Sequence, residues 1–215
     1  TKNITFILPD GISLSGVVTW SIEMCRCLAN LNRPVALLQY ENFTGLKIDT
    51  PLEFVLPGVH FISCKNLANP FGLQTEDDIA EHLVKYSEVL PSTFIPNWTN
   101  GAYATCALIA RTNPAALRVL GYAHADDPDY YELLNYFEPL IHRFVAVSQE
   151  IADRLKQDLP HRAQDIVVRP YAVKVPLSLK RTYSPQNRPV QLIYAGRILQ
   201  KQKRIFDLLD LVREL

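Results

Sequence analysis

Two basic side chains near the C-terminal end of the chain are spaced for binding an anion. Arg197 and Lys203 stand six positions apart in a loop that begins at Gly196. Apolar residues before and after the loop predict a strand over 190–194 and a helix over 206–215. The N-terminus of such a helix favours an anion such as a diphosphate, and Arg and Lys add the charge to hold it. From spacing alone, a solvated basic loop is an equally good interpretation.

Further candidate residues follow apolar runs in the first part of the chain. Asn97 and Trp98 follow the run 92–96 and offer an amide for hydroxyl groups and an aromatic face for stacking, although Trp98 is as readily explained as a core residue. His124 follows another apolar run. In an α/β protein, the loop after a buried strand is a usual place for binding residues.

Asp126 lies in the same polar and aromatic loop as His124. Its carboxylate could orient hydroxyl groups, help to bind a cation, or cap the helix that we expect from Tyr130. Capping is the simplest interpretation, because Asp is among the residues preferred at helix N-termini.

The elements that must position these residues alternate between strands and helices. Apolar runs predict strands over 4–8, 35–39, 60–63, 92–96, 117–122, 143–147 and 166–169, with helical periodicity between most of them. This alternation predicts an α/β fold with a Rossmann-like parallel sheet flanked by helices. The first loop contains Ser15 and Gly16 but no G-x-G-x-x-G fingerprint, and turn geometry is a sufficient explanation for the glycine.

Gly196, Arg197 and Lys203, with the helix behind them, resemble the Gly-Arg…Lys signature of retaining glycosyltransferases of family 4. The resemblance implies the GT-B architecture of two Rossmann-like domains, in which this Arg and Lys bind the diphosphate of a nucleotide-sugar donor. Arg204 stands where the family more often has Gly. Family 4 enzymes resemble one another in needing no metal, so the resemblance implies neither a metal ion nor a cofactor.

The resemblance extends to residues of the first part of the chain. Ser15 and Gly16 stand where the family has a Gly-Gly pair that lets donor and acceptor approach the backbone. His124 stands where the family has a His that contacts the transferred sugar, so the resemblance implies that it is the catalytic residue. At Tyr171 and Ala172 the family commonly has Asn-Gly. Asn97, Trp98 and Asp126 are then expected in the loops that contact the sugars.

Composition and resemblance together suggest three segments. Residues 1–175 are expected to form an N-terminal, acceptor-side GT-B domain, and the segment 176–189, rich in Pro, Ser, Lys and Arg, a linker. Residues 190–215 are expected to be the first strand and helix of a truncated C-terminal nucleotide-sugar domain, because about 25 residues cannot bury a core of their own. We therefore expect a fragment that lacks the Glu-x7-Glu region of the family and is nearly inactive alone.

Charge and composition exclude some classes of protein. The formal net charge is +0, so there is no overall basic field for nucleic acid. No apolar run is long enough to span a membrane and the N-terminal residues lack the pattern of a secretory signal, which favours a cytoplasmic location. The four cysteines have no metal-binding spacing, and we expect buried, reduced thiols.

The resemblance thus implies a retaining glycosyltransferase that moves a sugar from a nucleotide-diphosphate sugar to an acceptor hydroxyl. The acceptor would be a glycan, a polysaccharide or a lipid-linked sugar, as in polysaccharide biosynthesis. A lipid-linked acceptor would bring the protein to the inner face of the membrane as a peripheral protein. The alternatives are a non-catalytic sugar-binding or scaffold protein, and an epimerase or phosphorylase of the GT-B architecture.

Overall fold

The structure is a computed structural model that describes residues 3–8, 15–40, 56–64, 76–172, 178, 193–194 and 204–214. The chain divides into two compact units, Thr1–Ala172 and Val173–Leu215. The predicted diphosphate-binding residues Arg197 and Lys203 lie outside the described residues. The other candidate residues, from Ser15 to Asp126, all belong to the first unit.

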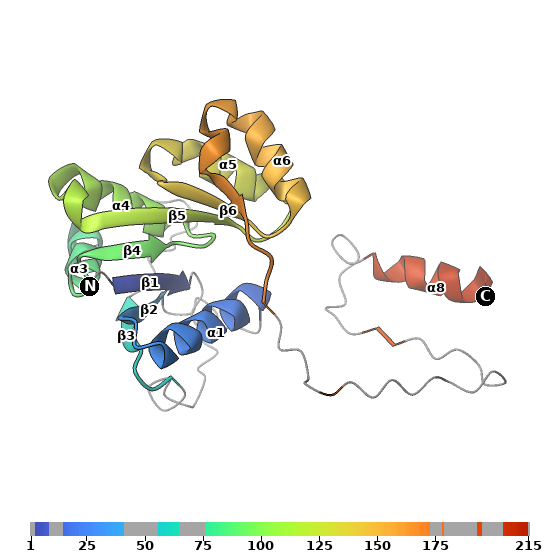
Figure 1. Cartoon of the computed structure of the whole chain (residues 1–215), viewed down its shortest axis with the longest axis horizontal. Coiled ribbons are helices and arrows are strands. Elements are labelled where there is room, and N and C mark those ends of the chain that lie inside the picture. Colours follow the sequence, from blue (N-terminus) through green and yellow to red (C-terminus); the bar gives the residue numbers. More distant parts are fainter. Residues whose placement is uncertain are drawn as a thin grey trace. The chain divides into compact units, whose positions relative to one another are not determined.

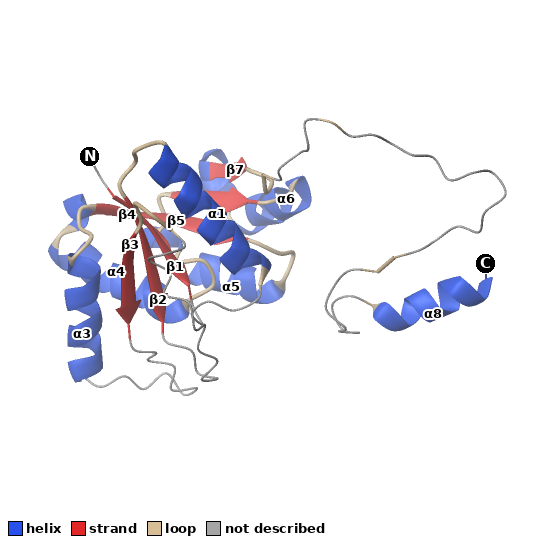
Figure 2. Cartoon of the chain, turned by 90° about the horizontal axis from the view of Figure 1, so that it is seen from below, coloured by secondary structure: helices blue, strands red, loops and turns tan. Residues whose placement is uncertain are grey.

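Seven strands form one sheet in the first unit. They are β1 (Asn3–Leu8), β2 (Val35–Tyr40), β3 (His60–Cys64), β4 (Ser92–Ile95), β5 (Leu117–Ala123), β6 (Arg143–Ala146) and β7 (Ile166–Val168). Their order is β3-β2-β1-β4-β5-β6-β7, and every neighbouring pair is parallel. Figure 2 shows β1, β2 and β3 pointing the same way. This confirms the predicted α/β fold with a Rossmann-like parallel sheet.

Helices cover the two faces of this sheet. They are α1 (Gly16–Asn30), α3 (Glu76–Ser87), α4 (Asn100–Thr112), α5 (Pro128–Tyr136) and α6 (Gln149–Asp158), with short 3-10 helices at Pro114–Ala116, Glu138–Leu140 and Pro160–Asp165. The apolar face of α1 packs in one core with β1 and β2, whereas α3, α4, α5 and α6 pack in a second core. In Figure 1, α1 lies on one side of the sheet and α4, α5 and α6 lie on the other.

The order of the strands reverses between β1 and β4. The chain runs outward from β1 through β2 to β3, and then returns to place β4 on the free side of β1, with Asn3 opposite Ser92 and Phe6 opposite Ile95. The connections on the two sides of this point therefore diverge. In parallel α/β sheets, ligands bind in the crevice at the carboxyl ends of the strands at such a reversal. The loops after β1 and β4 meet there.

Polar side chains cap three of the helices. Ser15 Oγ accepts from the backbone N–H of Val18 at 3.2 Å, and Ser148 caps α6 in the same way, as its sequence context predicts. The helix expected from Tyr130 begins earlier, at Pro128. Asp127 is its N-cap and accepts a backbone N–H in the first turn, and proline is well tolerated at the first helical position.

Three of the four cysteines are buried, as expected, but Cys27 is exposed. It lies two positions from Cys25 on α1, so the two side chains point in different directions, and only that of Cys25 faces the sheet. Burial raises the pKa of the Cys25 thiol to about 12. Cys25 is therefore an unreactive thiol at neutral pH.

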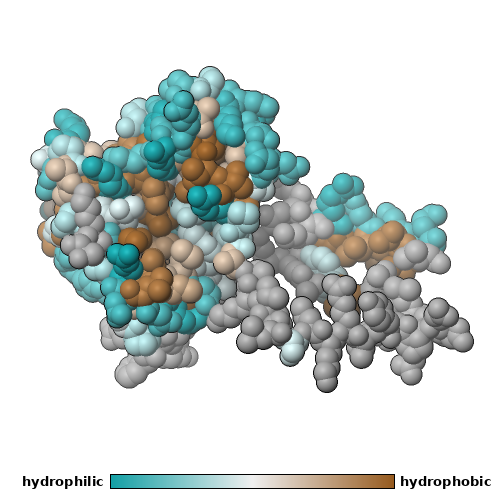
Figure 3. All heavy atoms as spheres, in the orientation of Figure 1, coloured by the Kyte–Doolittle hydropathy of each residue, from teal (hydrophilic) through white to brown (hydrophobic). Residues whose placement is uncertain are grey.

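The second unit contains α8 (Ile205–Glu214) among its described residues, which agrees with the helix expected there. Hydrophobic residues gather on one side of α8 and hydrophilic residues on the other (Figure 3). The strand expected over 190–194 is not seen at its two described residues: Ile193 and Tyr194 have no regular structure, and Ile193 is 90% exposed.

Candidate functional site

Asn97 joins the two strands at the reversal of the sheet. It lies in the turn after β4, is fully buried, and has a φ of 53°, a left-handed conformation that Asn tolerates better than most residues. Its side-chain amide donates to the carbonyl oxygen of Ile7 in β1 at 2.7 Å and lies 3.4 Å from Ser21 Oγ in α1. The side chain therefore connects the β4 turn to β1 and α1.

His124 continues this hydrogen-bond chain. It follows β5 and is only 8% exposed. Its Nε2 lies 2.8 Å from Asn97 Oδ1 and its Nδ1 lies 2.5 Å from the Tyr171 hydroxyl. Because the Asn97 amide nitrogen donates to Ile7, Oδ1 is an acceptor, so His124 must carry its proton on Nε2. Nδ1 then accepts from the Tyr171 hydroxyl.

Aromatic rings surround the imidazole of His124. The ring centroid of Trp20 lies 5.1 Å away, that of Tyr122 5.3 Å away in a stacked arrangement, and that of Tyr130 6.0 Å away. These rings exclude water without supplying a negative charge, and burial lowers the pKa of His124 to about 4. The imidazole is therefore neutral at physiological pH. It can donate and accept hydrogen bonds, but it is a weak base.

Tyr171 is the most accessible member of the chain of hydrogen bonds. It lies three residues beyond the end of β7 at Val168 and is 37% exposed. Burial raises the pKa of its phenol, so it stays protonated and donates to His124 Nδ1. A ligand hydroxyl that donates to Nδ1 must therefore replace the hydroxyl of Tyr171.

The start of α1 borders the same edge of the sheet. The side chain of Ser15 is engaged as the N-cap of α1 and Gly16 is exposed. The φ of Gly16 is not in the left-handed region, so turn geometry does not require a glycine there. Among the described residues, no atom lies within 4 Å of the position that a Cβ on Gly16 would take. The glycine leaves open space at the positive end of the helix.

The two remaining predicted residues lie on either side of the hydrogen-bond chain. Trp98 is 48% exposed, so the alternative that it is a core residue is wrong, and its ring lies 6.0 Å from that of Tyr130. The expectation that Asp126 caps the helix is wrong, because the N-cap of α5 is Asp127; Asp126 instead accepts a hydrogen bond from the Tyr131 hydroxyl at 2.6 Å. It lines a separate cavity of about 550 Å³, which Arg154 also lines. The structure thus joins Asn97 and His124 directly, but directs Asp126 elsewhere.

Sequence reasoning missed the aromatic residues around His124. Tyr122 precedes it by two positions on β5 and therefore shares its face of the sheet. Trp20 is four positions after Gly16, which is one helical turn into α1. Both spacings were available as signals. Tyr171 could not be found in this way, because nothing in its local sequence indicates that its hydroxyl reaches a residue 47 positions earlier.

Two features of the described residues bear on the kind of site. None of the helices described is both long and apolar enough to cross a membrane. In the same part of the chain, no group of three or more His, Cys, Asp or Glu side chains is placed to hold a metal ion. Comparison of the chain with protein-family models and with curated proteins finds no match.

Proposed function

We propose that this chain takes part in retaining glycosyl transfer, in which a sugar moves from a nucleotide-diphosphate sugar to the hydroxyl of a glycan, polysaccharide or lipid-linked acceptor. The observation that carries the proposal is the hydrogen bond between Asn97 and His124 at the reversal of the sheet. These residues come from loops after different strands and meet where a parallel α/β sheet binds its ligands. The open start of α1 at Gly16 lies at the same edge.

The chemistry of this site suits a sugar. A neutral imidazole, an amide and a phenol exchange hydrogen bonds readily with hydroxyl groups, and the neighbouring rings offer apolar faces. Because the pKa of His124 is lowered to about 4, its role in the proposal is to bind a sugar hydroxyl, and not to remove a proton. Tyr171 holds the place of that hydroxyl until the sugar binds.

The second part of the proposal concerns the basic residues of the second unit and the departing diphosphate. As the bond between the anomeric carbon and the diphosphate breaks, negative charge grows on the departing diphosphate. Arg197 and Lys203 would stabilise that charge, an electrostatic contribution that is usually the largest in such reactions. Both lie outside the described residues, so this assignment rests on the resemblance of their motif.

The experiment is a transfer and donor-hydrolysis assay with a panel of nucleotide sugars, on the natural polypeptide that contains this chain. The variants are Arg197→Ala and Lys203→Ala, with Arg204→Ala as the matched control. Arg204 belongs to the same basic stretch, but its guanidinium pairs with Asp207 at the start of α8. We expect turnover of one donor, its loss in both test variants, and activity in the control.

Two results would contradict the proposal. If no nucleotide sugar is turned over or bound, the chain is not part of a glycosyltransferase. If Arg197→Ala and Lys203→Ala behave like the control, the basic loop is only solvated surface. In either case a non-catalytic sugar-binding protein becomes the better account. Thermal unfolding of each variant is measured in parallel, so that loss of activity is not confused with loss of the fold.

A further inference from the structure

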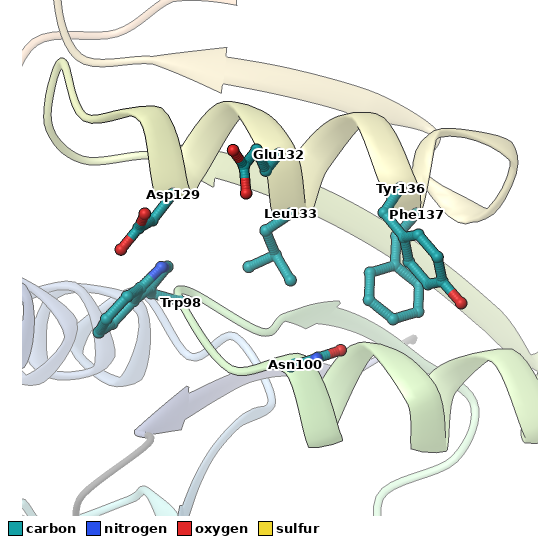
Figure 4. Close-up of a pocket in the computed structure, with 7 residues that line it drawn as sticks. All are labelled: Trp98, Asn100, Asp129, Glu132, Leu133, Tyr136 and Phe137. Atoms are coloured by element: carbon teal, nitrogen blue, oxygen red, sulfur yellow. The ribbon is translucent and has the colours of Figure 1, made fainter. Parts of the chain in front are cut away.

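A groove lies beside the hydrogen-bond chain, between α5 and the start of α4 (Figure 4). Its volume of about 480 Å³ is within the range of small-ligand sites. Trp98 lies at one end of the groove, and Tyr136 and Phe137 lie at the other, with Leu133 between them. The groove is therefore long, with an aromatic group at each end.

Two aromatic side chains of the groove are exposed to solvent, and a third packs on the core. Trp98 is 48% exposed and Tyr136 is 79% exposed. Phe137, in contrast, stacks on the fully buried Tyr103 of α4 at 5.1 Å between ring centroids, which anchors that end of the groove in the core. Large aromatic side chains left in water beside a preformed cavity are typical of a surface that binds the apolar face of a ligand.

The polar side chains that line the groove are two carboxylates, which accept hydrogen bonds, and one amide. Asp129 and Glu132 project from α5, and Asn100 lies across from them at the start of α4. No ion pair or side-chain hydrogen bond is recorded for the two carboxylates among the described residues. No Lys or Arg of the described part of the chain lines the groove. The two carboxylates therefore repel an anionic ligand and accept hydrogen bonds from hydroxyl or amine groups.

Tyr130 packs between one end of the groove and the candidate site. The ring of Tyr130 lies 6.0 Å from that of Trp98 and 6.0 Å from that of His124. Trp98 also directly follows Asn97, whose side chain is fixed by its bond to Ile7. The Trp98 end of the groove is therefore its end nearest to His124.

We propose that this groove binds a carbohydrate chain without acidic groups. One sugar ring stacks on the indole of Trp98, and hydroxyl groups donate to Asp129 and Glu132. Asn100 offers both a donor and an acceptor. The use of the groove as the acceptor subsite of a transfer reaction rests on the proposed function, whereas the binding itself does not and can be measured without a donor.

The test measures binding of trisaccharides to the full chain by isothermal titration calorimetry. The panel contains neutral trisaccharides of glucose, mannose, galactose and N-acetylglucosamine, an amino-sugar trisaccharide, and a uronic-acid trisaccharide. We expect at least one neutral or amino-sugar compound to bind and the uronic acid not to bind. Trp98→Ala should weaken binding about tenfold or more, because it removes the stacking surface.

Two further variants make the test specific. Val84→Ala is the matched control, because Val84 is an apolar residue that is 61% exposed on α3, away from the groove. It should bind like the wild type. The double variant Asp129→Asn, Glu132→Gln keeps the shape of the groove but removes its charge, and it should admit the uronic-acid trisaccharide. Circular dichroism confirms that each variant is folded.

Three outcomes would overturn the proposal. The first is that no member of the panel binds. The second is that the uronic acid binds the wild type as well as the neutral sugars do. The third is that choline binds while the sugars do not, which would make the groove a site for a cation held between carboxylates and rings. A chain that binds sugar in the groove but turns over no donor would contradict only the proposed transfer reaction.

Discussion

The buried imidazole of His124 should make the stability of the first unit depend on pH. Its folded-state pKa is about 4, whereas its ordinary value is 6.5. Between these values the unfolded chain binds a proton at His124 that the folded chain excludes. The free energy of unfolding therefore rises with pH through this window and falls as the solution is acidified. Protonation would break the bond from Tyr171 to Nδ1, because that nitrogen would become a donor.

The size of the effect follows from the two pKa values. Linkage over this window gives a loss of about 2 kcal/mol in the free energy of unfolding between about pH 7 and about pH 5. The assay is urea unfolding followed by circular dichroism at these two pH values. The control is His124→Gln, whose amide can keep the hydrogen bond to Asn97 but does not titrate. The pKa of His142 is also lowered by burial and by Arg118. Because His142 is present in both proteins, its contribution cancels when their stabilities are compared.

The prediction is tested by comparing how much unfolding free energy the wild type and His124→Gln each lose on acidification. We expect the wild type to lose about 2 kcal/mol more than His124→Gln on acidification. If both lose the same amount, His124 titrates in the folded protein at its ordinary pKa. The ring is then not held as a neutral hydrogen-bonding group, and the tautomer deduced from the contact with Asn97 does not describe the protein in solution.

Substitutions at three other positions test the hydrogen bonds and the packing of the first unit. Tyr171→Phe should lower the free energy of unfolding, measured with urea, by about 1–3 kcal/mol, because it leaves His124 Nδ1 buried without a donor. The same variant should bind a hydroxyl ligand at Nδ1 more tightly, which calorimetry measures. Gly121→Ala places a Cβ 2.7 Å from a methyl group of Leu134 and should destabilise by about 1–3 kcal/mol in the same unfolding assay; an unchanged midpoint would refute this close packing. Ser15→Ala removes the N-cap of α1 and should lower stability by about 1 kcal/mol, whereas Ser15→Asp should restore it.

Much of the fold of the first unit could be predicted because its strands are nearly continuous apolar runs. Strands such as Val35–Tyr40 are covered on both faces, and their sequences show it. The expected strand over 190–194 is similarly apolar, yet its described residues are not in a strand. Composition reports a tendency to form a strand, but the strand itself also requires a neighbour to pair with.

The candidate site was predictable in its location but not in its contacts. His124 and Asn97 follow buried strands, and the rule for parallel sheets brings such positions to one edge. The hydrogen bond between their side chains depends on the left-handed turn at Asn97, and no local sequence pattern predicts that turn. The groove was not predicted for a similar reason, since Trp98 and Tyr136 are 38 positions apart in the sequence and line the same groove only in the folded chain.

The distribution of charged residues along the chain supports the proposed function. The side chains that bond in the candidate site, Asn97, His124 and Tyr171, are uncharged at neutral pH, and the burial that keeps the imidazole neutral also makes the site unsuitable for a phosphate. The basic residues of the signature, Arg197 and Lys203, belong to the second unit. A nucleotide sugar is divided in the same way, into a neutral ring and a charged diphosphate. In the proposed function, hydrogen bonds hold the sugar and charge holds the diphosphate, so that only the second interaction strengthens as the bond between sugar and diphosphate breaks.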